Sequence, residues 1–340
     1  MLFDLNILKG KEFSLPIISV GNITVGGTGK TPHIEYLISI LKDKFKIAVL
    51  SRGYKRKTKD FRLVSFKSTY EEVGDEPTQI KMKHPDIQVA VDRKRVNGIN
   101  RLLNEFSDLN VILLDDAFQH RQVKPGLSIL LVDYFRPLKN DYILPAGSLR
   151  ERSVERRRAH IIIVTRCPPD IKPVEKQIFK KDLILFPFQN IFFTTYDYGD
   201  LSPVFDENKQ ELSCDYCKRK ETGLLLVTGI ANPQPLKNYL KNYFKNISEI
   251  RFPDHHEFND KDLIRIRNDF EKLRGRNKII ITTEKDAIRL QKFSTIASSL
   301  VQFIYYIPIH VKFPGNQKNE FNKLIQYYVR ENKRNNILLI

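Results

Sequence analysis

A glycine-rich segment near the start of the chain constrains the fold more than any other feature. Residues 24–31 read Thr-Val-Gly-Gly-Thr-Gly-Lys-Thr, between an apolar run and an amphipathic one. Glycines at a strand-to-helix turn let backbone N–H groups converge on phosphate oxygens, and the helix N-terminus favours anions. Only the first glycine of the usual G-x-x-x-x-G-K-[ST] pattern is replaced. We therefore predict a phosphate-binding P-loop made of Thr24, Val25, Gly26, Gly27, Thr28, Gly29, Lys30 and Thr31.

Short apolar runs alternate with amphipathic runs along most of the chain, which predicts an α/β fold with a mostly parallel sheet flanked by helices. The predicted strands are Pro16–Val20, Lys46–Leu50, Ile87–Val91, Val111–Asp115, Ser128–Val132 and Ile161–Thr165, with helices at Pro32–Lys42, Arg93–Glu105 and Asp170–Lys180. An extended segment follows at Phe186–Leu212. A second α/β series then predicts strands at Leu224–Thr228, Ser248–Phe252, Lys278–Thr283 and Phe303–Ile307, with helices at Pro235–Phe244 and Asp260–Leu273.

Two lobes follow from this pattern. We predict a P-loop domain over residues 1–200 and a smaller α/β lobe over residues 201–340 that contributes to the active-site cleft.

Two acids follow the apolar run at 111–114, at Asp115 and Asp116. An acid at the carboxyl end of a neighbouring strand holds Mg²⁺ in P-loop proteins, directly or through water. The Thr31 hydroxyl is a further ligand candidate, and either acid could make the direct contact. No guanine-specificity motif is present, because Lys285 is followed directly by Asp286. ATP and a kinase are therefore favoured over a GTPase switch.

Composition limits the remaining possibilities. The chain carries 57 Lys and Arg against 40 Asp and Glu, a net charge of +17. Such a balance fits nucleic acid, anionic lipid or phosphorylated substrates, and simple solubility as well. No run of apolar residues is long enough to span a membrane, and no signal peptide opens the chain. Cys214 and Cys217 form a C-x-x-C pair without a second pair, which favours reduced surface thiols over a zinc site.

Eight blocks of residues together resemble one family, the tetraacyldisaccharide 4′-kinases that act in lipid A biosynthesis. The blocks occur in the family's order from about Pro16 to about Gly315. They are 21–32 around the P-loop, Ser51–Tyr54, Gly74–Pro77, Asp115–His120, Leu144–Glu151, Thr228–Pro233, Phe252–His256 and Thr283–Asp286. A P-loop alone would be generic, whereas eight ordered blocks are highly specific.

The resemblance implies a reaction. The family transfers the γ-phosphate of ATP, with Mg²⁺, to the 4′-hydroxyl of a tetraacylated disaccharide 1-phosphate, and so makes lipid IVA. It works peripherally at the cytoplasmic face of the bacterial inner membrane. The family usually carries a membrane-docking helix before the P-loop strand. We expect Met1–Leu5 to be the tail of such a helix, or anchoring to rest on other basic and apolar surface.

The resemblance also assigns residues. Asp75 becomes the catalytic base, His255 from the second lobe pairs with it, and Glu76 supports Mg²⁺ with Asp115 or Asp116. It implies that the substrate contacts are made by Arg52, Arg93, Gln119, His120 and Arg150. Arg95 is an alternative to Arg93. Taken without the resemblance, Asp75 would more readily be a helix N-cap and His255 an ordinary loop histidine. Ala117 departs from the family's usual glycine, so the turn there must tolerate a methyl group. We expect the arginines at 156–158 to form a solvated or membrane-facing group.

Two other classes of function stay open at this point. The first is a P-loop ATPase that acts on nucleic acid, favoured by the positive charge but lacking a basic motif interleaved with aromatic residues. The second is a regulatory nucleotide-binding protein without phosphotransfer. We favour the lipid kinase, with the lipid disaccharide 1-phosphate and the membrane surface as partners, no nucleic acid and no obligate protein partner.

Overall fold

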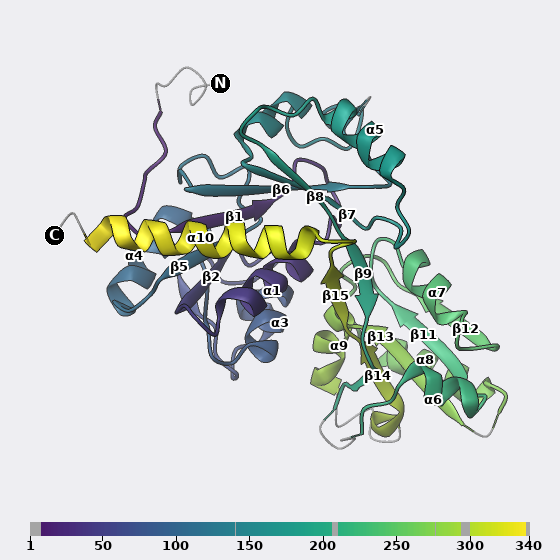
Figure 1. Ribbon diagram of the computed structural model, residues 1–340. Helices are drawn as coiled ribbons and strands as arrows, with labels where there is room; N and C mark the ends of the chain where they lie inside the picture. Colours follow the sequence, from purple (N-terminus) through teal and green to yellow (C-terminus); the bar gives the residue numbers. More distant parts are fainter. Residues whose placement is uncertain (1–7, 140, 206–209, 276, 294–299, 338–340) are drawn as a thin grey trace. The chain divides into compact units, whose positions relative to one another are not determined.

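The computed structural model describes residues 8–139, 141–205, 210–275, 277–293 and 300–337, with side chains to residue 332. Backbone contacts divide the chain into two units, residues 1–197 with 311–340, and residues 198–310. Figure 1 shows the chain with its elements labelled. Two connecting strands, β9 (Thr195–Tyr198) and β15 (Ile309–Lys312), pair with each other where the chain passes between the units.

The first unit is built on an eight-stranded sheet in the order β3-β4-β2-β5-β1-β6-β7-β8, parallel except for the edge strand β3. Its strands are β1 (Ile17–Gly21), β2 (Ile47–Ser51), β3 (Arg62–Leu63), β4 (Gln88–Val91), β5 (Val111–Asp115), β6 (Leu127–Asp133), β7 (Ile161–Thr165) and β8 (Asn190–Phe193). The helical elements are α1 (Lys30–Leu41), α2 (Tyr70–Val73), α3 (Asp75–Lys83), α4 (Arg95–Glu105), the 3₁₀ helix η1 (Ser153–Arg158), α5 (Pro173–Leu183) and α10 (Gln317–Ile337). The predicted α/β class with a mostly parallel sheet is confirmed.

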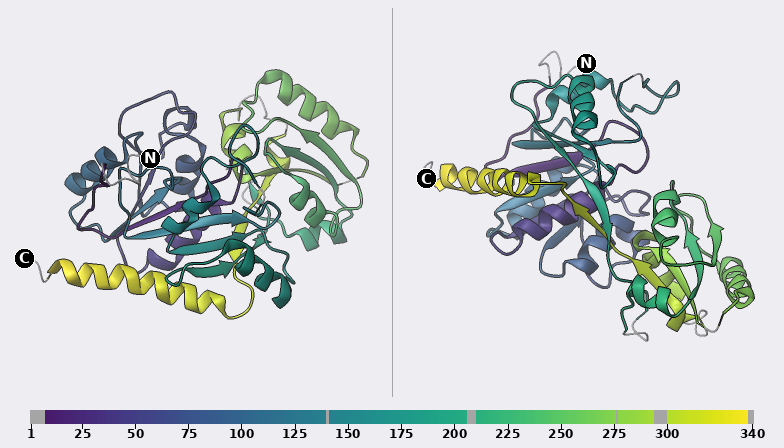
Figure 2. Two further views of the ribbon diagram at one scale, coloured as in Figure 1. Left: turned by 90° about the horizontal axis from the view of Figure 1, so that it is seen from above. Right: turned by 45° about the vertical axis from the view of Figure 1, so that its right-hand side comes forward.

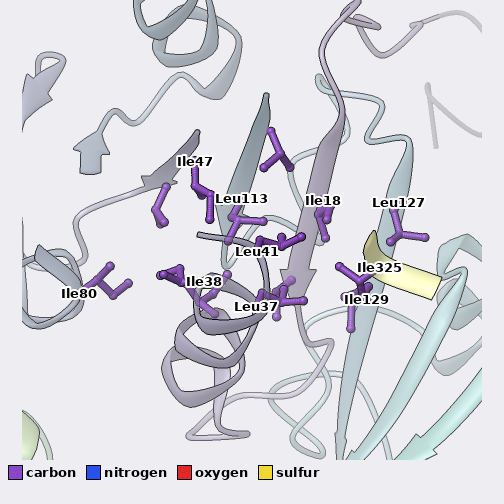
Figure 3. Packing of buried hydrophobic residues seen from close by; sticks show 14 of the residues in the cluster. Ile18, Leu37, Ile38, Leu41, Ile47, Ile80, Leu113, Leu127, Ile129 and Ile325 are labelled. Atoms are coloured by element: carbon purple, nitrogen blue, oxygen red, sulfur yellow. The ribbon is translucent and has the colours of Figure 1, made fainter. Parts of the chain in front are cut away.

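Helices cover both faces of this sheet, so its strands are apolar on both sides. On one face, Leu37, Ile38 and Leu41 of α1 pack on Ile18 and Leu113 of the central strands, as Figure 3 shows. Figure 3 also shows Ile325 of α10 beside Leu127 and Ile129 of β6. On the opposite face, α4 and α5 bury their apolar sides. The central strands β1 and β5 are thereby fixed, and with them the loops at their carboxyl ends.

The second unit holds a five-stranded sheet in the order β10-β14-β13-β11-β12, parallel except for β10. Its strands are β10 (Ser202–Pro203), β11 (Gly223–Thr228), β12 (Ile247–Arg251), β13 (Lys278–Thr283) and β14 (Ile304–Ile307). Its helices are α6 (Cys214–Arg219), α7 (Gln234–Leu240), α8 (Asp260–Lys272) and α9 (Glu284–Leu290), with 3₁₀ helices η2 (Gln291–Phe293) and η3 (Val301–Phe303). Helices α8 and α9 pack on one face of the sheet, and α6 and α7 on the other.

The division differs from the predicted domains at the C-terminal end. Residues 311–340, which we assigned to the second lobe, belong with the first unit. The reason is helix α10, yellow in Figure 1, whose Phe321, Ile325 and Val329 are buried in the core that α1 shares with the sheet. Figure 2 shows α10 against the first unit from two further directions. The predicted membrane-helix tail at Met1–Leu5 lies outside the described residues.

The cysteine pair is not at the surface, contrary to our expectation. Cys214 and Cys217 are buried in the apolar core between α6 and the second sheet, where burial raises the pKa of Cys214 to about 12 and that of Cys217 to about 11. Protonated, buried thiols behave as small apolar side chains. No helix in the described ranges is both long enough and apolar enough to span a bilayer.

Candidate active site

The P-loop joins β1 to α1 at the carboxyl edge of the sheet. Gly29 caps α1 with a φ of 87°, and Gly26 has a φ of 86°. A Cβ added to Gly29 would lie 1.8 Å from the Tyr196 hydroxyl oxygen, so only glycine fits there. The N–H groups of residues 26–31 donate to no backbone carbonyl within the described chain. They are the donors that a phosphate group needs.

The missing first glycine has a structural explanation. Thr24 is buried and forms an isolated antiparallel bridge with Leu149, and the N–H of the next residue, Val25, donates to the Ser148 carbonyl oxygen at 2.8 Å. The chain is extended here, and Thr24 is not among the residues with positive φ. A threonine therefore replaces glycine at this position without backbone strain.

Lys30 and Asp116 lie together in this site. The Lys30 ammonium group is 3.6 Å from Asp116 Oδ1, and Arg150 Nη2 donates to the same oxygen at 3.0 Å. Arg150 also donates to the side-chain oxygen of Asn22 and, at 3.1 Å, to its carbonyl oxygen. Burial alone would raise the pKa of Asp116, but Lys30 and Arg150 outweigh it and lower that pKa. Asp116 is therefore held as a carboxylate between two cations.

Asp115 has a different environment. Its side chain is buried at the end of β5, and Ser51 Oγ donates to Oδ2 at 3.3 Å. Burial, reinforced by the charges of Glu76 and Asp116, raises the pKa of Asp115 to about 6. The second oxygen, Oδ1, is buried and accepts no hydrogen bond from the described residues. A buried carboxylate oxygen without a donor is costly unless a cation is bound there.

These acids fit Mg²⁺ bound together with phosphates. Within the described ranges, no three His, Cys, Asp or Glu side chains converge as a closed protein cage for a metal. Mg²⁺ commonly binds through one or two carboxylates and completes its coordination with waters and substrate phosphates. Asp115, with its orphaned Oδ1, is the best-placed carboxylate for such a role, and Thr31 lies buried at the start of α1.

Asp75 is positioned by a tight packing of two turns. It is the first residue of α3 and is buried, and Gly74 before it has a φ of 97°. A Cβ added to Gly74 would lie 3.1 Å from the Cα of Gly53. The Asp75 turn therefore packs against the turn that follows β2 and carries Arg52. Asp75 is not the N-cap, since Gly74 occupies that position.

The predicted substrate residues differ in exposure: Gln119 and His120 are half-buried, and Arg52 is exposed. His120 is surrounded by charged site residues, and burial, with Arg95 and Arg52 nearby, lowers its pKa to about 4. Gln119 Nε2 donates to the Asn22 carbonyl oxygen at 2.7 Å, so this side chain supports the loop that precedes the glycines. Arg52 is exposed at the end of β2.

Arg93 and Arg95 differ in burial, which favours Arg93 as the predicted substrate residue. Arg93 is exposed, as a substrate-binding side chain requires. Arg95 is 1% exposed and donates to the carbonyl oxygens of Asp92 and, at 3.0 Å, Asp115. Arg95 therefore holds the ends of β4 and β5 together, and Arg93 remains the candidate for substrate.

His255 belongs to the second unit. It has a φ of 60°, and Arg289 Nη2 lies 2.9 Å from His255 Nδ1. A guanidinium group only donates, so Nδ1 accepts and the neutral ring carries its proton on Nε2. The pairing of His255 with Asp75 stays a prediction.

Two sets of supporting residues were missed by the sequence analysis. Arg136 donates to the carbonyl oxygens of Val25 at 2.9 Å and Gly27 at 3.5 Å, and its Nε donates to the buried Asp133 at 2.8 Å. His33 Nδ1 lies 2.7 Å from the Gly29 carbonyl oxygen, which fixes the proton on Nδ1. The one signal for His33 was its place one turn after the P-loop lysine; nothing local marks Arg136.

Two of the arginines at 156–158 are bound to the protein and are not a solvated group, while the membrane-facing alternative stays a prediction. Arg158 donates to the Phe118 carbonyl oxygen at 2.9 Å and lies over the Phe118 ring, and Arg156 donates to the Leu183 carbonyl oxygen. Both side chains bind η1 to neighbouring segments of the first unit. Of the three arginines, Arg157 is the exposed one.

A glycine loop with Lys30, which follows a central strand and lies beside the carboxylates of the neighbouring strand, defines a P-loop nucleotide-binding protein. The family model of tetraacyldisaccharide-1-P 4′-kinase matches residues 1–330. The chain belongs to the tetraacyldisaccharide 4′-kinase family, as its sequence blocks predicted.

Individual members of this family are similar to the chain over nearly its whole length. The tetraacyldisaccharide 4′-kinase of Bacteroides fragilis is 50% identical over 340 residues, covering 99% of this chain and 90% of the relative. That of Bacteroides thetaiotaomicron is 47% identical, covering 98% and 90%. Among solved structures, LpxK from Aquifex aeolicus in complex with ATP is 30% identical and superposes with a TM-score of 0.72, covering 96% of this chain and 93% of the other.

Proposed function

We propose that this protein is an ATP-dependent kinase that phosphorylates the 4′-hydroxyl of tetraacyldisaccharide 1-phosphate, yielding lipid IVA. The observation that carries the proposal is the arrangement at the carboxyl edge of the first sheet. Lys30 lies against Asp116. Asp115 is buried, accepts a hydrogen bond from Ser51 and is affected by the charge of Glu76. The Asp75 turn packs on the turn at the end of β2. The nucleic-acid ATPase alternative has no support in the family to which the chain belongs.

We assign the proton transfer to Asp75. A sugar hydroxyl is a poor nucleophile and needs a base that accepts its proton in line with the transferred phosphoryl group. Asp75 is a carboxylate fixed by its helix start and by the Gly74–Gly53 contact. Such fixed placement lowers the entropic cost of reaching the reactive geometry.

The charges around the phosphates follow from the same geometry. Lys30 and the N–H groups of residues 26–31 would bind the β- and γ-phosphates of ATP. Asp115, with support from Asp116, Glu76 and Thr31, would hold Mg²⁺, whose charge would offset that of the phosphates. Arg150 fixes Asp116 so that this carboxylate does not turn away from Lys30.

We assign the anionic 1-phosphate of the substrate to exposed arginines, with Arg52 and Arg93 as the first candidates. We also propose that the protein acts peripherally at the cytoplasmic face of the inner membrane, where a tetraacylated acceptor resides. The net charge of +17 supports attraction to an anionic leaflet.

The test is direct phosphotransfer. Purified protein is incubated with labelled ATP, Mg²⁺ and the lipid disaccharide 1-phosphate, and lipids are separated by thin-layer chromatography. We expect a new bis-phosphorylated lipid. Asp75→Ala should lower turnover by roughly a hundredfold or more while ATP binding stays near the wild-type value, because only the proton acceptor is removed.

Lys30→Ala is the matched comparison, since it should weaken ATP binding itself. Near-normal turnover of Asp75→Ala on the disaccharide would show that another group is the base. ATP binding without any transfer by the wild type would show that the protein is regulatory.

A further inference from the structure

Exposed apolar side chains are concentrated in the loop between β6 and β7. Tyr142, Ile143 and Leu144 expose 67%, 45% and 48% of their surface, and Pro145 and Ala146 are exposed as well. We call residues 142–146 the apolar tip. Soluble proteins rarely display consecutive apolar side chains without a partner for them.

Internal hydrogen bonds hold the tip in this form. Asp141 Oδ1 accepts from the N–H groups of Tyr142 at 2.8 Å and Ser148 at 2.9 Å, and Oδ2 accepts from the Ser148 hydroxyl. The N–H of Leu144 donates to the Leu149 carbonyl oxygen at 2.9 Å, and that of Leu149 donates to the Tyr142 carbonyl oxygen at 2.9 Å. The apolar side chains therefore project from a fixed loop and do not fold back onto the protein.

The tip is joined directly to the phosphate-binding loop. Besides the bridge between Thr24 and Leu149 and the bond from Val25 to Ser148, the N–H of Arg150 donates to the Ile23 carbonyl oxygen at 2.7 Å. Val25 at the apex of the P-loop is itself 37% exposed. The tip and the P-loop are thus joined by paired backbone, with Val25 exposed on the P-loop side.

Basic side chains follow on the same connection between β6 and β7. Lys139 and Arg157 expose 56% and 49% of their side chains, and Arg152 is exposed. Lys139 lies near Asp182 and Arg157 near Glu155, yet all three basic side chains reach solvent. An apolar tip with exposed basic residues on the same connection matches a bilayer that has an anionic headgroup layer over hydrocarbon.

We propose that the apolar tip, residues 142–146, docks the protein onto an anionic lipid bilayer and sets the P-loop at the level of the headgroups. The proposal rests on the proposed function, because a phosphoryl acceptor that is a lipid keeps its acyl chains in the membrane while its sugar reaches Lys30. A second protein copy would also cover apolar surface, but it would not account for the exposed basic residues on the same connection or for the link to the phosphate-binding loop.

The test uses two matched double variants of the full chain. Tyr142→Ser with Ile143→Ser removes two of the apolar side chains of the tip. Met82→Ser with Tyr327→Ser removes the same kind of surface elsewhere on the first unit, since Met82 and Tyr327 are 44% and 66% exposed. Each protein is sedimented with vesicles of phosphatidylethanolamine and phosphatidylglycerol, without substrate or ATP. We expect the tip variant to bind about tenfold more weakly or worse, and the control to bind like the wild type.

Equal vesicle binding by both variants, or no binding by the wild type, would overturn the proposal. So would a wild-type dimer in sedimentation equilibrium that the tip variant alone disrupts, since the tip would then serve a second copy. Activity on disaccharide dispersed in detergent is measured separately. A wild type that docks through the tip but transfers no phosphate would refute the proposed function and leave the docking surface standing.

Discussion

At the scale of single residues, Arg136 is the side chain that holds the backbone of the P-loop. Its guanidinium binds the carbonyl oxygens of Val25 and Gly27, so those carbonyls turn outward and leave the N–H groups of the loop for phosphate. We predict that Arg136→Ala raises KM for ATP roughly tenfold, with a smaller effect on kcat, because binding groups lose their fixed placement. Initial rates at varied ATP concentration measure both constants.

The control for this prediction is Arg136→Lys, which keeps the charge but cannot bridge two carbonyls and Asp133 together. It should give an intermediate KM. Asp133 retains Arg166 as a partner in both variants, so thermal stability should change little. An unchanged KM in Arg136→Ala would show that the loop keeps its shape without the guanidinium.

His33 links the P-loop to pH-dependent stability. It is buried, and burial lowers its pKa to about 4 from the ordinary value of 6.5. The unfolded chain therefore takes up a proton at higher pH than the folded protein does. The stability from His33 is complete above about pH 6.5 and is lost as pH falls toward about 4, a change of about 3 kcal/mol.

We predict that His33→Gln flattens this part of the profile, because glutamine does not titrate and its amide can still donate to the Gly29 carbonyl oxygen. Urea unfolding at a series of pH values between 7 and 4 tests it. Burial also lowers the pKa of His84 and His160, but both remain in each protein, so the difference between the two profiles reports His33. Parallel profiles would contradict the assignment.

At the scale of elements, helix α10 completes the core of the first unit. Phe321 is 1% exposed, and its ring packs on Phe313 at 4.8 Å and on Phe192 at 5.2 Å between ring centroids. We predict that Phe321→Ala lowers the free energy of unfolding of the first unit by about 3–5 kcal/mol, as expected for a large cavity in a packed core. Denaturant unfolding followed by circular dichroism measures the change.

Tyr327→Ala on the exposed side of the same helix is the control, with an expected change within about 0.5 kcal/mol. Similar losses in both variants would show that the loss does not come from the burial of Phe321, and helix propensity could not explain it, since alanine raises propensity at either position.

The strands were predictable from sequence to within a few residues, because a strand buried on both faces is a continuous apolar run. The predicted run Val111–Asp115 is β5 itself, and Pro16–Val20 is β1 displaced by one residue. Helix α10 was not predicted, although Phe321, Leu324, Ile325, Tyr328 and Val329 have helical spacing that would have revealed it. Its membership of the first unit could not have been found this way, since periodicity does not say which core a helix joins.

At the scale of the whole molecule, we expect the adjacent histidines His255 and His256 of the second unit to have separable roles. His256 Nε2 lies 2.8 Å from Asp262 Oδ2, and its ring stacks on Phe252 at 4.5 Å, so its contacts are structural. We predict that His255→Ala lowers turnover on the disaccharide about tenfold or more, whereas His255→Asn, which tolerates the positive φ and can accept from Arg289, keeps stability and still loses turnover. His256→Ala should lower thermal stability and change turnover less. Steady-state rates and melting temperatures of the variants separate an effect on turnover from an effect on stability.

If His255→Ala is silent and His256→Ala is not, the pairing with Asp75 was assigned to the wrong histidine. If both are silent in turnover, Asp75 needs no partner from the second unit.

The sequence by itself determined the class of fold, the P-loop, the acidic pair after β5 and the family, because each depends on residue types at fixed spacing along the chain. It did not determine what holds these groups in place. Arg136 is more than a hundred residues from the carbonyls it binds, and the burial of Arg95 but not Arg93 is visible only in the folded chain. The tertiary structure likewise determined that Cys214 and Cys217 are buried and that α10 joins the first unit. Burial and hydrogen bonding between distant segments arise only when the chain has folded, and local patterns do not encode them.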